Sequence, residues 1–299
     1  MNKILFGTDL SHESLCAAKW TAAFARHLDE QGYAGSIVCV HIASPESLVG
    51  LGGPKGGIRG LKDEVAQWLE EVSFPGEVEI LIRSGSPSKE IPDLVEELDV
   101  DFLILGQTGK GSLAKVFLGT TAEKIALRPT CTTILVKEEP FNWSGPLSIL
   151  ACIDGEESSY DAAVLGAKFF APFGLEVTLA KVLTLPKMGT GLIDAPSLPA
   201  ALKDELDQME NQARREIKER WNALTSELEI STAIELRPGY PTHELLAMIE
   251  EKRPSLVTLG SNRRSALSRF FLGSVGHGLI RQAPTTFLIE PGKLTETLE

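Results

Sequence analysis

Short apolar runs alternate along the chain with longer stretches in which apolar residues recur at helical spacing. This alternation predicts parallel β-strands joined by helical crossovers. The predicted strands of the first half are residues 4–8, 36–42, 78–82, 102–105 and 133–136, and those of the second half are 147–153, 176–183, 229–236, 256–259 and 285–289. Nearly every position in these runs is apolar, which indicates strands covered by helices on both faces.

The same five-strand pattern occurs twice. Glycines and prolines at 85, 87, 106 and 119 are matched by the same residue types at 239, 241, 260 and 273, each 154 positions further on. Residues 138–146 hold two prolines, a glycine and charges, as expected of a connection between domains. We therefore predict an α/β protein with two tandem flavodoxin-like or Rossmann-like domains, 1–139 and 146–291, each a five-stranded parallel sheet with helices on both faces.

Composition and charge exclude several classes of function. The 299 residues suit two domains, and 43% apolar with 23% charged residues is ordinary globular composition. A net charge of -12 disfavours binding to a nucleic-acid backbone. No long apolar run predicts a membrane span, and the acid at Asp9 interrupts the apolar start of the chain, so we expect a cytoplasmic protein. The four cysteines stand singly, which gives no support for disulfides or zinc.

A glycine pattern follows the predicted strand at 102–105. Gly106 and Gly109 lack a Cβ, so the backbone can turn sharply there and approach a ligand closely. Gly119, Thr120 and Thr121 open a predicted helix, where main-chain amides and hydroxyls favour phosphate. Residues 106–128 carry four basic side chains and one acidic one, and residues 260–281 carry four basic and none acidic. Two basic islands in an acidic chain predict anion binding.

The spacing of Gly106, Gly109 and Gly119-Thr120 after a strand resembles the ATP-binding signature of the universal stress protein family, and the resemblance extends to both halves. It implies that Asp9 contacts the adenosine end of ATP and that the backbone near Ile42 borders the adenine. Gly106, Gly109, Gly119, Thr120 and Thr121 would surround the ribose and phosphates. The implied cofactor is ATP, AMP or ADP, with Mg²⁺ on the phosphates. The last strands of the two halves would pair about a pseudo-twofold axis, forming an intramolecular pseudo-dimer, and a homodimer stays open.

Two readings of Asp9 and two of Arg263 stay open. Asp9 follows the first strand, where ligands of open α/β sheets bind, but it could instead cap the next helix. In the second half Arg263 stands where the second glycine is expected. Its side chain would exclude a nucleotide by filling the space, or would pair with a phosphate. We expect exclusion, so that nucleotide is bound mainly by the first half.

The sequence thus indicates an adenine-nucleotide-binding protein of stress response or signalling. A nucleotide-free interaction scaffold of the same fold and a slow ATP-hydrolysing enzyme are the alternatives. No His-Glu metalloprotease pattern, nucleophile elbow or P-loop is present, so we predict no catalytic residues, no metal ligands from the protein and at most slow turnover.

Overall fold

The computed structural model describes residues 2–33, 35–44, 57–107, 118–137, 143, 146–184, 200–261 and 271–292. The first half contains β1 (Asn2–Thr8), α1 (His12–Glu30), β2 (Gly35–Ala43), α3 (Ile58–Leu69), β3 (Val78–Ser84), α4 (Pro87–Leu98), β4 (Phe102–Gly106), α5 (Thr120–Ala126) and β5 (Thr132–Val136). The second half contains β6 (Ser148–Cys152), α6 (Glu157–Phe170), a short 3₁₀ turn (Ala171–Phe173), β7 (Glu176–Leu183), α7 (Ala200–Leu224), β8 (Ser231–Pro238), α8 (Pro241–Lys252), β9 (Leu256–Ser261), α9 (Ser274–Gln282) and β10 (Thr286–Pro291).

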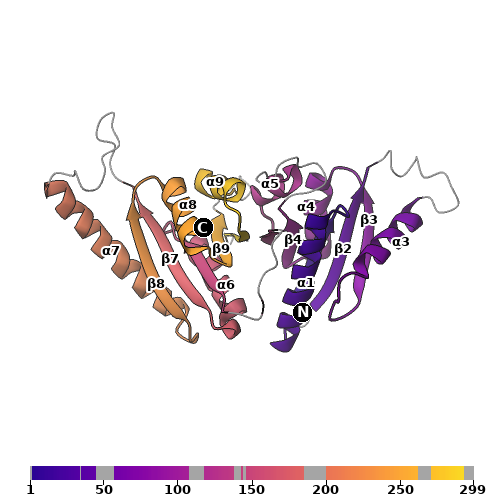
Figure 1. Ribbon diagram of the computed structural model, residues 1–299, viewed down its shortest axis with the longest axis horizontal. Coiled ribbons are helices and arrows are strands. Elements are labelled where there is room, and N and C mark those ends of the chain that lie inside the picture. The colour runs from indigo at the N-terminus through magenta and orange to yellow at the C-terminus, as the bar shows by residue number, and fades with distance from the viewer. Residues whose placement is uncertain are drawn as a thin grey trace, which may run out of the picture.

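All these strands lie in one ten-stranded sheet with the order β3-β2-β1-β4-β5-β10-β9-β6-β7-β8. Strands pair in parallel within each half, and β5 pairs antiparallel with β10 at the centre of the sheet. Figure 1 shows the two halves side by side, with β3 and β8 toward opposite ends of the molecule. The predicted α/β fold is confirmed, and the two predicted sheets are joined into one. The predicted strand over 229–236 lies two residues later, because β8 keeps its pairing with β7 as far as Pro238.

Helices cover both faces of the sheet. Along β1, Ile4 and Phe6 face one apolar core and Leu5 faces the other, as expected for a strand buried on both sides. The first core packs under α1, α3, α6 and α7, and the second under α4, α5, α8 and α9. Each core contains residues of both halves, so the two halves share their hydrophobic interior.

An aromatic cluster joins α1 to α6 across the middle of the molecule. The Phe24 ring centroid lies 5.7 Å from that of Phe169 and 6.1 Å from that of Phe170. The ring centroid of Trp20 lies 5.3 Å from that of Trp143, in the connection between the halves, with the two rings tilted against each other. The buried His27 donates from Nε2 to the main-chain oxygen of Phe169 at 2.6 Å. Apolar area and a buried hydrogen bond therefore both hold the halves together.

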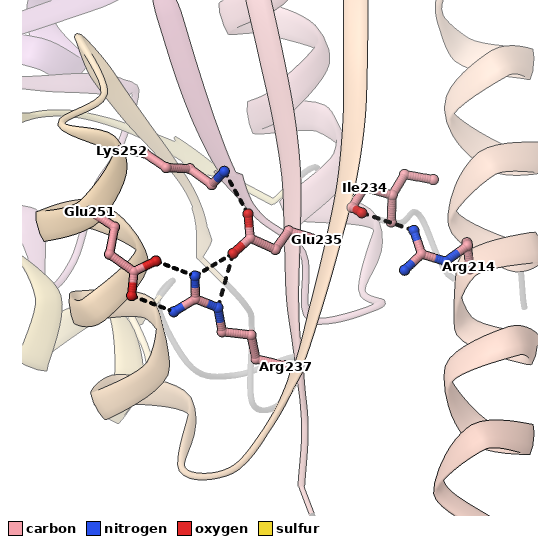
Figure 2. Close-up of polar contacts among 6 residues, drawn as sticks. All are labelled: Arg214, Ile234, Glu235, Arg237, Glu251 and Lys252. Atoms are coloured by element: carbon pink, nitrogen blue, oxygen red, sulfur yellow. Dashed lines mark hydrogen bonds and ion pairs between the residues drawn. The ribbon is translucent and has the colours of Figure 1, made fainter.

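Charged side chains tie the outer strands to the helices beside them. In the first half Arg83 of β3 pairs with Glu97 of α4 at 2.7 Å. At the equivalent positions of the second half, Arg237 of β8 binds Glu251 of α8 and also Glu235. Figure 2 shows this network, with Glu235 also held by Lys252.

The outer strand β8 is covered on its open side by α7. Arg214 of α7 donates from Nη1 to the carbonyl oxygen of Ile234 at 2.9 Å (Figure 2). Such a bond occupies a main-chain acceptor that an edge strand would otherwise offer to another chain. Together with the charges on β8, it protects this end of the sheet from further strand pairing.

The cysteines differ in burial. Cys39 and Cys131 are buried, whereas Cys16 and Cys152 are partly exposed. Burial raises the pKa of Cys39 and Cys131 to about 12, and no disulfide joins any of the four. Within the described part of the chain, no helix is both long enough and apolar enough to cross a membrane.

We expect the two halves to unfold as one cooperative unit. Replacing Phe170 of α6, which is 1% exposed, with alanine removes its ring contacts to Trp20 and Phe24 of α1 and should cost about 3–5 kcal/mol of unfolding free energy. Ile58→Ala, at a side chain that is 59% exposed, is the control and should change it by less than about 0.5 kcal/mol. Urea titration followed by hydrogen exchange should show peptides of both halves losing protection together. Loss of protection in the second half alone would contradict a shared core.

Candidate functional site

The sheet register brings three of the predicted site residues to one edge. β1 lies between β2 and β4, with Thr8 opposite His41 and Phe6 opposite Ile104. These strands are parallel, so their carboxyl ends meet, and Asp9, Ile42 and Gly106 lie at that edge. From β1 the chain adds β2 and β3 in one direction along the sheet and then adds β4 and β5 in the opposite direction. The gap between β1 and β4 is therefore the topological switch point of the first half. Open α/β sheets bind their ligands at such points.

The turn after β1 is fixed by its own side chains. Thr8 Oγ1 accepts a hydrogen bond from the Leu10 amide at 2.9 Å, and Asp9 Oδ1 accepts one from the Ser11 amide at 3.1 Å. Ser11 caps α1 by accepting from the Ser14 amide at 3.1 Å. Leu10 has a φ of 61°, a left-handed conformation that is uncommon outside glycine. A strained residue held this firmly is typical of functional sites, although here it also shapes the start of α1.

His41 and Ile42 lie near the end of β2, beside this turn. His41 donates from Nδ1 to the main-chain oxygen of Thr8 at 2.9 Å, which fixes the orientation of a partly buried ring. Ile42 is half-buried and packs against the core under α4 and α5. The edge of β2 therefore offers main-chain groups and an apolar surface next to Asp9, the kind of surroundings that suit a planar base.

The loop that follows β4 is closed at its described ends. The Gly119 amide donates to the carbonyl oxygen of Gln107 at 2.6 Å, and the Gln107 amide donates to the carbonyl oxygen of Val136 at 2.9 Å. Gly119 is the N-cap of α5 and makes no side-chain capping bond, so the first amides of α5 lack the usual acceptor. Thr120 is exposed and Thr121 half-buried. Gly109 lies outside the described residues.

The structure thus brings Asp9, Ile42 and Gly106 to one edge, and the bond between Gln107 and Gly119 keeps Gly119, Thr120 and Thr121 next to Gly106. Gln107 itself was not singled out in the sequence. A comparison of the two halves could have drawn attention to Gln107, because the 154-residue repeat aligns it with Ser261, so the halves differ at this position.

The corresponding edge of the second half differs in its side chains. Asp154 Oδ1 accepts from the Glu156 amide at 2.9 Å, matching the turn at Asp9. Arg220 of α7 donates from Nη1 to the carbonyl oxygen of Gly155 at 3.3 Å and lies 4.3 Å from the ring centroid of Tyr160. Lys181 lies two residues before the end of β7, as His41 lies two residues before the end of β2. The turn in the second half is therefore held by a cation of its own half, and Arg263 lies outside the described residues.

Two features bear on the chemistry of these strand ends: the protonation of the Cys152 thiol and the arrangement of possible metal ligands. The thiol of Cys152 is itself buried although part of the residue is exposed, and this burial, with a further contribution from the Asp154 carboxylate, raises the pKa of the thiol to about 12, so it stays protonated near neutral pH. In the described parts of the chain, no group of three or more His, Cys, Asp or Glu side chains is arranged to hold a metal ion.

Gly260, the second-to-last residue of β9, has a role in packing. A Cβ at this position would lie 2.4 Å from the carbonyl carbon of Ser158 and from the amide nitrogen of Ser159, at the start of α6. The absence of a side chain at Gly260 therefore lets helix and strand approach, in addition to any use in ligand binding.

Fold and site together define a doubly wound α/β protein, duplicated in one chain, with a glycine motif at the switch point of its first half. The profile of the universal stress protein family matches residues 1–137 and 147–290. The chain belongs to the universal stress protein family, and each half is a member of it.

Individual relatives agree with this assignment. The universal stress protein MJ0531 of Methanocaldococcus jannaschii is 30% identical over 146 residues, which are 46% of this chain and 82% of that protein. The universal stress protein Rv2319c of Mycobacterium tuberculosis is 23% identical over 69% of this chain and 70% of its own length. A universal stress protein from Archaeoglobus fulgidus has a similar fold, with a TM-score of 0.60 at 19% identity, covering 97% of this chain and 98% of that one.

Two glycines of the second half give a matched test of the packing role. Gly260→Ala should destabilise the protein by about 1–3 kcal/mol, because the new methyl group meets main-chain atoms that can move only with α6. Gly273→Ala is the control, since among the described residues no atom beyond its chain neighbours lies within 4 Å of the added Cβ, and φ is −59°. Its unfolding free energy, measured by urea titration, should change by less than about 0.5 kcal/mol. Equal effects would show that packing at the end of β9 does not require glycine.

Proposed function

We propose that the first half of the chain binds an adenine nucleotide, ATP in the first place, at the carboxyl ends of β1, β2 and β4, in a stress-response or signalling role. The observation that carries the proposal is the register that brings Asp9, Ile42 and Gly106 together at the switch point of the first half. The full glycine motif is found in that half only, and membership of the universal stress protein family supports the same class of function.

Each residue has a role that its chemistry suits. The Asp9 carboxylate would accept hydrogen bonds from the adenosine end, and the backbone and side chain of Ile42 would border the base. Gly106, Gly109, Gly119, Thr120 and Thr121 would surround the ribose and phosphates. The uncapped first turn of α5 fits a phosphate, because its amides point away from the helix and lack an internal acceptor. ATP would bring Mg²⁺ with it on the phosphates.

The second half is proposed to bind nucleotide weakly or not at all. Its sequence places Arg263 where the second glycine of the motif is expected. Its strand ends carry Lys181 in place of His41, and Arg220 is bonded to the turn that follows Asp154. These cations would attract phosphate, but a long side chain at 263 would fill space that the first half leaves to bare backbone.

The two aspartates provide the test. Each accepts a hydrogen bond from the amide two residues further on, so Asp9→Ala and Asp154→Ala should cost similar turn stability. In calorimetry of the full chain with Mg-ATP, Asp9→Ala should weaken binding about tenfold or more, equivalent to about 1.4 kcal/mol. Asp154→Ala should leave the affinity unchanged.

The remaining outcomes contradict the proposal in different ways. No binding of ATP, ADP or AMP by the unmodified protein would favour the nucleotide-free scaffold. Loss of affinity in Asp154→Ala but not in Asp9→Ala would place the site in the second half. Unchanged affinity in both variants would show that neither turn contacts the nucleotide.

A further inference from the structure

Gln107 links the edge of the proposed site to the other half of the molecule. Its side chain donates from Nε2 to the carbonyl oxygen of Thr285 at 2.5 Å, directly before β10. Thr285 is itself buried and held, because its hydroxyl donates to the carbonyl oxygen of Pro254 at 3.0 Å. The acceptor is therefore a fixed point of the second half.

The carbonyl oxygen of Gln107 accepts from the Gly119 amide, which joins the two described ends of the loop after β4, and the Gln107 amide donates to the carbonyl oxygen of Val136 at the end of β5. One residue thus contacts three places: the end of β5, the start of α5 and the second half. A shift of Gln107 would move Gly119 and the first turn of α5 with it. The position of the proposed phosphate-binding turn therefore depends on a side-chain bond to the other half.

A second contact holds α5 from the same direction. His277 of α9 donates from Nε2 to Glu123 Oε1 at 2.7 Å, and Arg281 lies 3.6 Å from the same oxygen. The Leu272 amide donates to the carbonyl oxygen of Leu127 at 3.0 Å, just beyond α5. Figure 1 shows α5 and α9 next to each other at the centre of the molecule. The middle and the end of α5 are therefore bonded directly to the second half, and its start is linked to the second half through Gln107.

The arrangement is not reciprocal. The position equivalent to Gln107 is Ser261, which is fully buried. Within the described part of the chain its hydroxyl makes no hydrogen bond, so it provides no corresponding tie to the first half. The carbonyl oxygen of Cys131, equivalent in position to that of Thr285, accepts instead from Thr133 of its own strand. The side-chain support found at Gln107 thus runs from the second half to the first.

We propose that the second half holds the nucleotide site of the first half in its binding conformation, and that Gln107 is the positioning residue through which it does so. This inference rests on the proposed function. The second half, whose own glycine motif is altered, would thereby raise the affinity of the first half for nucleotide. A residue that only stabilised the contact between the halves would change unfolding without changing nucleotide affinity.

Gln107→Met tests the inference in the full chain, because methionine keeps the side-chain length but cannot donate to Thr285. Ser261→Ala is the matched control at the equivalent position. Titrated with Mg-ATP, Gln107→Met should bind about tenfold more weakly than the unmodified protein, and Ser261→Ala should bind equally well. Hydrogen exchange of a peptide covering 118–126 should become faster in Gln107→Met without nucleotide and slow again when ATP saturates the protein.

Other results overturn the inference. Lower thermal stability of Gln107→Met with unchanged ATP affinity would leave the residue a purely structural one, while the proposed function would stand. An unmodified protein that binds no ATP would remove the proposed function and the inference with it. If Gln107→Met does not fold, His277→Leu replaces it. The inference predicts weaker ATP binding from this change in the second half, and unchanged binding would refute it.

Discussion

The pairing of β5 with β10 is the interaction on which the rest of the structure depends. Every residue of β5 is buried, and so are the first four residues of β10. Without each other, both strands would be apolar edges with unpaired main-chain groups, a liability that folded proteins avoid. Their antiparallel pairing moves the sheet edges out to β3 and β8, where charged networks and α7 protect them.

This pairing also decides which residues meet at the centre. Positions 123 and 277 are equivalent in the two halves, and they face each other as Glu123 and His277. Two identical halves would place two like side chains there, whereas the tandem chain places a donor opposite an acceptor. The duplicated chain can thus specialise each half: the first keeps the glycine motif, and the second supplies complementary groups such as His277 and the carbonyl oxygen of Thr285.

Much of the fold could be predicted from the sequence, because parallel strands buried on both faces need nearly continuous apolar runs. The constant repeat predicted the duplication, and the pairing of the last strands followed from the family resemblance. Strand ends were less predictable: β8 is shifted because its register depends on β7, which the sequence of β8 alone does not encode. The partial exposure of Cys16 and Cys152 likewise depends on packing between elements.

The site was only partly predictable for a similar reason. Asp9 and the glycines could be found because their residue types and spacing are distinctive. The bond from Gln107 to Thr285 joins residues 178 positions apart and depends on the central strand pair, so no local pattern reveals it. The packing of Gly260 against the start of α6 is equally a tertiary constraint, and a glycine there resembles one required by a ligand.

The most direct measurement is the number of ATP molecules bound per chain at saturation, determined by equilibrium dialysis. One intact site in the first half predicts a value near one for the unmodified protein and a rise toward two in Arg263→Gly, where the space expected in the second half is restored. Two molecules bound before the change, with weaker binding after it, would show that Arg263 pairs with phosphate and that both halves bind nucleotide.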